Sequence, residues 1–178
     1  MMYKGTLLTD TISIHEVFTI HYFEYMSDFS FAGESHNFWE FVFVDKGEID
    51  IYMESIHARL KKRGRSPFTN QNEFHRLQAT GSSAPNLVVI SFECSDAVMQ
   101  FFEGKIFSLD ETEKILLGEI VKEAKTLFNC RLDDPYLTEM QNASSLRLVQ
   151  NNLSGFIWSI FCSICFVANR IVLLRLQK

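Results

Sequence analysis

Apolar and polar residues alternate through much of the first half of the chain with the two-residue period of a β-strand. Residues 48–53 (EIDIYM) show this best, because Ile49 and Ile51 alternate with Asp50 and Tyr52. The pattern predicts a strand with one buried side and one solvent-facing side. Runs of aromatic and β-branched residues predict further strands over residues 17–25, 38–44, 73–79 and 87–93.

Turn-forming residues separate these predicted strands. Asp45-Lys46-Gly47 lies between residues 38–44 and 48–53, so we predict a hairpin turn with positive φ at Gly47. A cluster of Gly, Ser and Pro over residues 81–85 predicts a second turn.

The second half of the chain has helical patterning instead. Asp96 to Phe102 is predicted as a short helix, and Ser108-Leu-Asp-Glu111 as a capping box that opens a longer one. Tyr136 to Gln150 is predicted as a further helix. On the longer helix, apolar residues recur at helical spacing and are our candidates for dimerisation: Ile115, Leu116, Ile120, Val121 and Leu127.

The last segment is the most apolar part of the chain. Leu153 to Ala168 carries no charge, but Asn169 and Arg170 interrupt the run before it reaches the roughly 20 residues that a membrane span needs. We therefore expect a buried or interfacial helix and no membrane partner; a membrane-tethered domain is the less favoured alternative. Cys162 and Cys165 have metal-site spacing but lack a second ligand pair, so we interpret them as small buried residues.

Composition narrows the class of protein. A chain of 178 residues is the length of one domain, and its 17 Phe suit the interior of a β-structure. The net charge of −5 argues against a nucleic-acid-binding module. The one basic run, residues 59–65, is interpreted as a solvated loop or strand edge. We interpret the four Cys as reduced thiols. The N-terminus lacks the apolar core of a signal peptide, so we expect a cytoplasmic protein.

A histidine, a glutamate and a glycine form the most informative motif. His36, Glu40 and Gly47 have the spacing of the first cupin motif, which the segment resembles. Glu34 stands where that motif has its first histidine, and Asp28 where it has its first glycine. His75 matches the histidine of the second cupin motif, although Asn70 and Asn72 replace its proline and glycine.

The wider sequence is more specific. FWEFVFVDKGEIDIY followed by NEFHRL and then helices resembles the N-terminal sensor and dimerisation domain of AraC-type transcription regulators, over roughly residues 6–150. The resemblance implies an α+β fold, with a cupin-like β-barrel (a double-stranded β-helix) at 6–95 and C-terminal α-helices in a dimerisation region at 96–152. Residues 153–178 remain as an apolar tail.

The same resemblance implies a function. We expect a domain that binds a small-molecule effector such as a sugar, forms a homodimer or a heterodimer with an intact relative, and is not an enzyme. The family's DNA-binding helix-turn-helix domain normally follows, and the chain ends at Lys178 before it. We therefore expect no direct nucleic-acid binding by this chain.

The candidate ligand-binding residues are His36, Trp39, Glu40, Tyr52 and His75. Trp39 or Tyr52 could stack on a ligand ring. His36, Glu40 and His75 are also candidate metal ligands, because two imidazoles and one carboxylate make a common iron or manganese set. The alternatives are polar contacts to an organic ligand or a hydrogen-bonded group without a ligand. We expect no cofactor; a small metal-dependent cupin enzyme of dioxygenase or isomerase type is the second interpretation.

Two segments depart from the sequence pattern of the AraC-type family that the chain resembles. We back-translated both segments with freely chosen synonymous codons and read the result one nucleotide earlier. In this shifted frame residues 63–71 (RGRSPFTNQ) can spell a strand-like sequence, and residues 157–169 can spell an amphipathic helix. We therefore hypothesise that 63–71 and 153–178 are frameshift products, which the nucleotide sequence tests. Because Gly64 and Pro67 break a β-ladder, we expect a ragged segment without strand pairing at 63–71.

Overall fold

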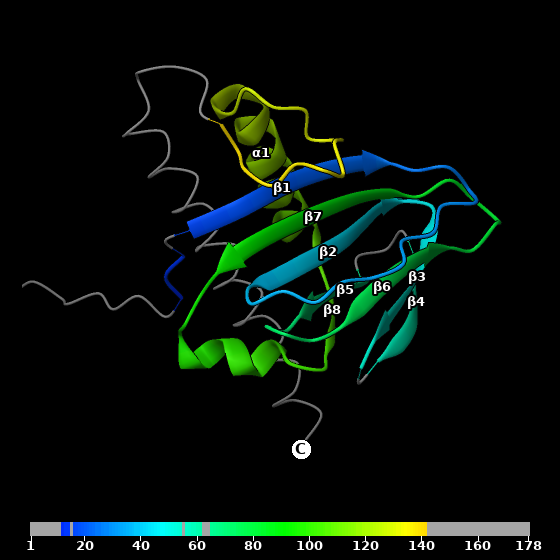
Figure 1. Cartoon of the computed structure of the whole chain (residues 1–178), viewed down its shortest axis with the longest axis horizontal. Coiled ribbons are helices and arrows are strands. Elements are labelled where there is room, and N and C mark those ends of the chain that lie inside the picture. The colour runs from blue at the N-terminus through cyan, green and yellow to red at the C-terminus, as the bar shows by residue number, and fades with distance from the viewer. Residues whose placement is uncertain (1–11, 15, 55, 62–64, 142–178) are drawn as a thin grey trace, which may run out of the picture.

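The computed structural model describes residues 12–14, 16–54, 56–61 and 65–141 (Figure 1). Strands dominate these ranges, and helical segments follow the last long strand. The strands are β1 (Glu16–Glu24), β2 (Trp39–Lys46), β3 (Glu48–Met53), β4 (His57–Lys61), β5 (Arg65–Thr69), β6 (His75–Ala79), β7 (Asn86–Glu93) and β8 (Ile106–Ser108). The helices are the 3-10 helix η1 (Ala97–Phe102) and the α-helix α1 (Glu111–Leu127).

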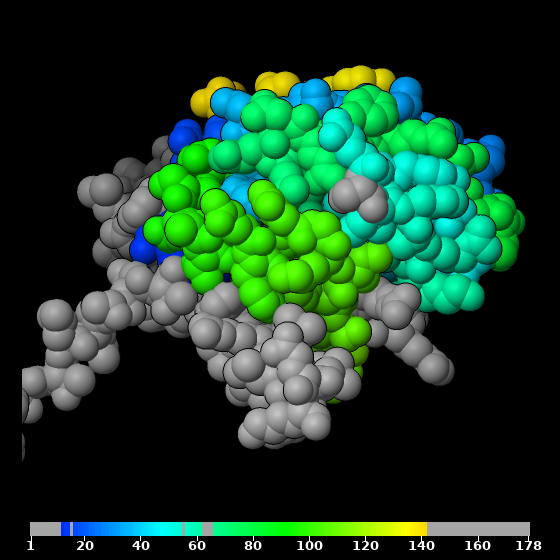
Figure 2. Space-filling view, turned by 90° about the horizontal axis from the view of Figure 1, so that it is seen from below, coloured from blue at the N-terminus to red at the C-terminus, as the bar shows by residue number. Residues whose placement is uncertain are grey.

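The strands form two antiparallel sheets. The larger has the order β1-β7-β2-β5-β8, and the smaller has the order β4-β3-β6. Figure 1 shows α1 beside the β1 edge of the larger sheet. In Figure 2 the cyan atoms of β3 and β4 lie at one end of the visible face, and the green atoms of the segment around η1 lie at the other. The predicted β-rich fold with a helix after it is confirmed at this level.

β2 separates two hydrophobic clusters, because successive side chains on a strand point to opposite faces. Trp39, Phe41 and Phe43 belong to a cluster that also contains the buried residues of η1 and α1. Val42 and Val44 belong to a second cluster, shared with buried residues of the smaller sheet such as Ile49, Ile51, Leu60 and Leu77. The second cluster therefore fills the space between the two sheets.

The turn at Gly47 has the predicted positive φ, 74°, but it does not close a hairpin. β2 pairs with β7 and β5, whereas β3 pairs with β4 and β6. The hairpin prediction was wrong because Gly47 carries the chain from one sheet into the other. A Cβ at Gly47 would lie 2.7 Å from the Ala84 carbonyl oxygen, so this crossing also needs the space that glycine leaves.

The expectation of a segment without strand pairing at 63–71 was wrong for residues 65–69. They form β5, which pairs with β2 at Phe68 and Thr69 and with β8 at residues 65–67. Phe68 is only 1% exposed and contacts the rings of Phe41 and Phe102. Pro67 lies outside the residues that pair with β2, so its missing N–H does not interrupt that ladder. Residues 62–64 lie outside the described residues.

α1 begins two residues later than the capping box predicted. Its N-cap is Asp110, whose carboxylate accepts from the Glu113 amide at 2.9 Å while the Glu113 carboxylate accepts from the Asp110 amide. Ser108 is not the cap, because it ends β8 in register with Arg65.

The candidate dimerisation residues divide into two groups. Ile120, Val121 and Leu127 are buried within this chain, whereas Leu116 is half-buried and Ile115 is 66% exposed. Packing of this helix against its own sheet therefore uses most of the apolar face that the spacing identified. Contact of these residues with a second chain stays a prediction.

The helix predicted from Tyr136 is absent from residues 136–141, which follow turns that include Pro135. The Tyr136 amide donates to the Asp134 side chain at 2.9 Å, a bond typical of an Asx turn rather than a helix. The preceding segment lies along β1, where the Tyr22 amide donates to the Leu132 carbonyl at 3.0 Å. Residues 142–150, and the apolar tail at 153–178, lie outside the described residues. In the part of the chain that the structure describes, no helix is long and apolar enough to cross a membrane.

Candidate functional site

A polar cluster interrupts the apolar space between the sheets. It contains Glu40 from β2, His75 at the start of β6, and Glu34 and His36 from the segment before β2. One potential ligand atom from each of the four side chains lies within 4.8 Å of the others. Glu40 and His75 are buried, His36 is half-buried and Glu34 is exposed. The cluster is therefore open to solvent on the Glu34 side.

Both imidazoles are oriented by backbone carbonyls. His36 Nδ1 lies 2.9 Å from the Phe38 oxygen, and His75 Nδ1 lies 3.2 Å from the Glu73 oxygen. Because a carbonyl oxygen only accepts, each Nδ1 carries a hydrogen, and in the neutral ring the lone pair is then on Nε2. Both Nε2 atoms face Glu40, at 3.7 Å for His36 and 3.3 Å for His75.

These two Nε2 atoms are buried and have no well-aligned hydrogen-bond partner among the described residues. Buried polar atoms are normally satisfied, so two unsatisfied atoms facing the same carboxylate require an explanation. A metal ion coordinated by both nitrogens, or a ligand that forms hydrogen bonds with both, would provide one.

Backbone contacts hold the cluster together. Glu34 and His75 form an isolated antiparallel bridge, and the Asn72 amide donates to the His36 carbonyl at 2.6 Å. Gly33 makes the bridge possible, because its φ is 103° and a Cβ there would lie 2.7 Å from the His75 carbonyl oxygen.

Glu40 is the electrostatic centre of the cluster. Burial raises the pKa of its carboxyl, but the adjacent His36 and His75 imidazoles outweigh burial and lower the pKa to about 2. Burial lowers the pKa of His75, and its interactions with Glu40 more than offset that, so the pKa is raised above 6.5. Glu40 is therefore anionic at neutral pH and favours a cation beside it.

Two hydroxyl groups extend the cluster across the larger sheet. Ser91 on β7 donates to Glu40 Oε2 at 3.3 Å, and Thr19 on β1 donates to Ser91 at 3.1 Å. Neither residue was a sequence candidate. Their alternation with buried apolar neighbours showed only that they lie in strands, and nothing in that pattern showed that β1 and β7 flank β2.

The structure brings together three of the five candidate ligand-binding residues, His36, Glu40 and His75. Trp39 points to the opposite face of β2, where its indole N–H donates to the Cys94 carbonyl at 3.1 Å. Tyr52 alternates with the buried Ile51 and Met53 and so lies on the outer face of β3.

On that outer face, Tyr52 stacks on His57 and lies 4.0 Å below the Arg76 guanidinium. The basic run begins on the same sheet, where Arg59 and Lys61 of edge strand β4 pair with Asp50 and Glu48. This confirms the strand-edge interpretation for these two residues. The structure therefore places Tyr52 and Trp39 away from His36, Glu40 and His75, and one sequence does not say which face of a strand turns inward.

Glu34 is the residue that the sequence candidates omitted. A signal was present, because Glu34 stands where the cupin motif has its first histidine. Two imidazoles and two carboxylates suit a divalent first-row metal ion, and the two unsatisfied Nε2 atoms fit such an ion. The residues present therefore fit a metal.

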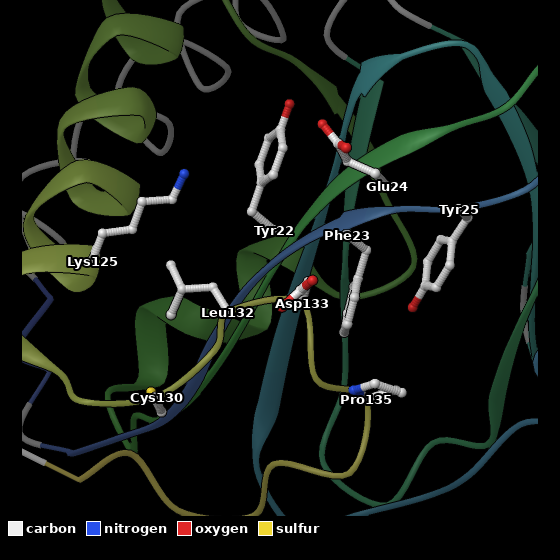
Figure 3. A pocket seen from close by; sticks show the side chains of 9 residues that line it. All are labelled: Tyr22, Phe23, Glu24, Tyr25, Lys125, Cys130, Leu132, Asp133 and Pro135. Atoms are coloured by element: carbon white, nitrogen blue, oxygen red, sulfur yellow. The ribbon is translucent and has the colours of Figure 1, made fainter.

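A separate hollow of about 620 Å³ lies around the edge strand β1, between α1 and the segment at 130–135 (Figure 3). Its lining includes Tyr22, Tyr25, Lys125 and Asp133. Figure 3 shows Lys125 extending from α1 toward Tyr22, and its Nζ lies 5.5 Å from the Tyr22 ring centre. Sequence reasoning did not identify this hollow, because it depends on where the chain returns beside β1.

The chain is similar to solved structures in fold but not in sequence. No protein-family model matches it, and no curated protein matches its sequence significantly. An apo variant of ToxT from Vibrio cholerae matches 85% of this chain and 56% of its own, with 9% identity and a TM-score of 0.52. The chain thus spans about half the length of ToxT.

Two further matches have lower TM-scores. ToxT from Vibrio cholerae with a bound unsaturated fatty acid gives 0.48, with 10% identity over 84% of this chain and 53% of that one. An RmlC-like cupin family protein with a double-stranded β-helix fold from Methanocaldococcus jannaschii gives 0.38, with 15% identity over 52% and 87%. The match to apo ToxT, together with the antiparallel sheets, supports a β-rich fold like that of the matched part of ToxT.

Proposed function

We propose that this chain is the effector-sensing and dimerisation domain of an AraC-type transcription regulator, and that a small-molecule effector binds at the cluster of His36, Glu40 and His75. The observation that carries the proposal is a buried polar cluster within an otherwise apolar interior. Binding sites for small molecules typically combine apolar walls with a few such convergent polar groups.

The comparison with ToxT, an AraC-type regulator, supports the same class of function. ToxT has been solved with an unsaturated fatty acid bound, so that protein accommodates a small organic molecule. The regulatory role, the effector and the dimer are proposals for this chain.

The electrostatics favour binding over catalysis. A general base works best when its pKa lies near the operating pH, and Glu40 has a pKa of about 2. Contacts with the two histidines keep the Glu40 carboxylate ionised. Glu40 is therefore suited to orienting a ligand as a fixed negative charge. Glu40 is therefore unsuited to act as a general base, and we propose that the domain is not an enzyme.

Thermal unfolding of the purified chain with a panel of compounds tests this function. The panel contains unsaturated fatty acids and monosaccharides. An effector at about one hundred times its Kd is expected to raise Tm by roughly 5–10 °C. Glu40→Gln should abolish the shift, whereas Tyr52→Ala, on the outer face of β3, should retain it.

The outcomes distinguish binding at the interior cluster from binding in the hollow around β1. A shift that survives Glu40→Gln and disappears in Lys125→Ala would place the effector in the hollow around β1 and overturn the interior site. Stabilisation by no compound of the panel would count against the sensor function.

A second candidate is a small metal-dependent cupin enzyme, which the two unsatisfied Nε2 atoms favour. His36, Glu40 and His75 would hold the metal, which would act as a Lewis acid toward a bound substrate. Turnover of a substrate that requires stoichiometric metal and is lost in His75→Ala would favour this enzyme over the sensor.

A further inference from the structure

The hollow around β1 shares no lining residue with the polar cluster at Glu40. Its volume of about 620 Å³ is in the range typical of sites for small organic molecules. The lining combines three aromatic rings of β1 and the residue after it with apolar side chains of the segment that follows α1: Tyr22, Phe23, Tyr25, Leu132 and Pro135. The hollow therefore offers an apolar wall for the body of a ligand.

Hydrogen bonds hold two parts of this wall in place. The Leu132 carbonyl accepts from the Tyr22 amide at 3.0 Å, and His21 Nδ1 lies 3.2 Å from the same oxygen. The Tyr22 hydroxyl donates to Asp45 at 2.7 Å, which fixes the ring at its far end. The hollow is therefore formed without a ligand, as binding sites for small molecules usually are.

Two opposite charges border the hollow. Among the described residues, the Lys125 ammonium forms no ion pair and contacts the Tyr22 ring, whose centre lies 5.5 Å away. The Glu24 carboxylate is exposed and accepts one long hydrogen bond, of 3.5 Å, from the Asn86 side chain. Figure 3 shows Lys125 and Glu24 on opposite sides of the Tyr22 ring.

The third charged residue of the lining, Asp133, is already paired. Its carboxylate accepts two hydrogen bonds from Arg131, at 2.8 and 3.0 Å. One cation and one anion thus remain for a ligand. A purely anionic ligand would be repelled by Glu24 and a purely cationic one by Lys125, whereas a zwitterion complements both charges.

We propose that the hollow around β1 binds a free α-amino acid with an aromatic or large aliphatic side chain, at a second site that is independent of the effector site proposed above. Lys125 binds the α-carboxylate and Glu24 binds the α-ammonium group. The side chain packs against Tyr25 and Leu132. Because Lys125 is in the last turn of α1, the bound amino acid joins this helix to the edge of the larger sheet.

Calorimetric titration of the full chain with L-phenylalanine tests the proposal. Two analogues each lack one charge: hydrocinnamate has no ammonium group, and phenethylamine has no carboxylate. One molecule of L-phenylalanine should bind per chain. Each analogue should bind at least about tenfold more weakly, because each loses one charge-assisted hydrogen bond.

Two substitutions test which residue recognises which charge. Lys125→Gln should weaken L-phenylalanine binding at least about tenfold but should not weaken phenethylamine binding, since phenethylamine has no carboxylate. Glu24→Gln should likewise weaken L-phenylalanine binding and not hydrocinnamate binding. Lys122→Gln and Glu119→Gln, which break an exposed ion pair elsewhere on α1, are the matched controls and should bind L-phenylalanine like the unmodified chain. Lys125 and Glu24 are exposed, so both variants should fold, which thermal unfolding checks.

The proposal fails if L-phenylalanine, L-tyrosine and L-leucine all fail to bind at millimolar concentration, or if hydrocinnamate binds as tightly as L-phenylalanine. It also fails if folded Lys125→Gln binds L-phenylalanine with unchanged affinity. Glu40→Gln separates this site from the effector site, because it should abolish stabilisation by the effector and leave amino-acid binding unchanged. Loss of amino-acid binding in Glu40→Gln would place the amino acid at the polar cluster and overturn the proposal.

Discussion

Glu34 and His75 face each other across an isolated antiparallel bridge in which each amide donates to the other's carbonyl oxygen at 3.0 Å. The bridge ties the segment before β2 to the first residue of β6. Since Glu40 lies on β2 in the other sheet, the cluster joins both sheets. The first prediction concerns the glycine beside this bridge.

Gly33→Ala should destabilise the protein more than Gly81→Ala. Both glycines have positive φ, so both alanines carry a backbone strain of about 1 kcal/mol or more. A Cβ at Gly33 would also lie 2.5–2.9 Å from Phe74, His75 and Arg76, whereas a Cβ at Gly81 meets nothing within 4 Å. Urea unfolding of both variants measures the difference, and equal losses would show that the close approach at Gly33 does not matter.

The Glu40–His75 pair should stabilise the metal-free protein most between about pH 4.5 and 6.5. The lowered pKa of Glu40 contributes stability above 4.5 that is lost as the pH falls toward 2. The raised pKa of His75 contributes stability below 6.5 that is lost as the pH rises through its folded value. Chemical unfolding of EDTA-treated protein across pH measures this profile. In Glu40→Gln the profile should flatten, and an unchanged profile would contradict the assignment.

Phe68→Ala should cost about 3–5 kcal/mol of unfolding free energy, because the ring is buried among four other phenylalanines. Phe74→Ala removes the same side chain from a site that is 46% exposed and should cost far less. Calorimetric unfolding compares them. Similar small losses would mean that β5 does not contribute to the core.

Asp110→Ala should cost about 1 kcal/mol, because it removes the side chain that accepts the Glu113 amide. Ser108→Ala should change stability little, since Ser108 is exposed and is not the cap. Urea unfolding decides between the two residues. A larger loss of unfolding free energy in Ser108→Ala than in Asp110→Ala would show that Ser108 is the N-cap, as the sequence pattern indicated.

If α1 contributes to dimerisation, Ile115→Glu should shift the chain toward monomer without unfolding it, because Ile115 is 66% exposed. Ile120→Glu should instead unfold the chain, since it places a charge in the buried cluster under α1. Size-exclusion chromatography with light scattering, together with circular dichroism, measures both. An unchanged mass in Ile115→Glu would argue against this face of α1.

The strands that alternate clearly were predictable from the sequence. Residues 48–53 form β3 as expected, and the predicted strands at 17–25 and 87–93 differ from β1 and β7 by one residue at each shifted end. β5 was not predictable by this route, because Arg65, Ser66 and Pro67 lack the composition of a strand. Tertiary packing of Phe68 overrides that local preference.

The partners of each strand and the faces they present were not predictable. The Asp45-Lys46-Gly47 turn indicated a hairpin, yet only the sheet topology shows that Gly47 leads into a second sheet. The motif spacing did identify His36, Glu40 and His75 as a group, although His36 lies before β2 and not on it. Ser91 and Thr19 join this group through contacts that no local spacing records.

Trp39 and Glu40 are consecutive residues of β2, yet one is packed in the cluster that includes α1 and the other lies in the polar cluster between the sheets. One peptide unit therefore joins a residue on one face of the larger sheet to a residue on the other face. The Trp39 indole N–H donates to the Cys94 carbonyl at 3.1 Å on the face opposite Glu40. Trp39 fluorescence, recorded in a Trp158→Phe variant, therefore tests whether a ligand at Glu40 changes the opposite face of β2.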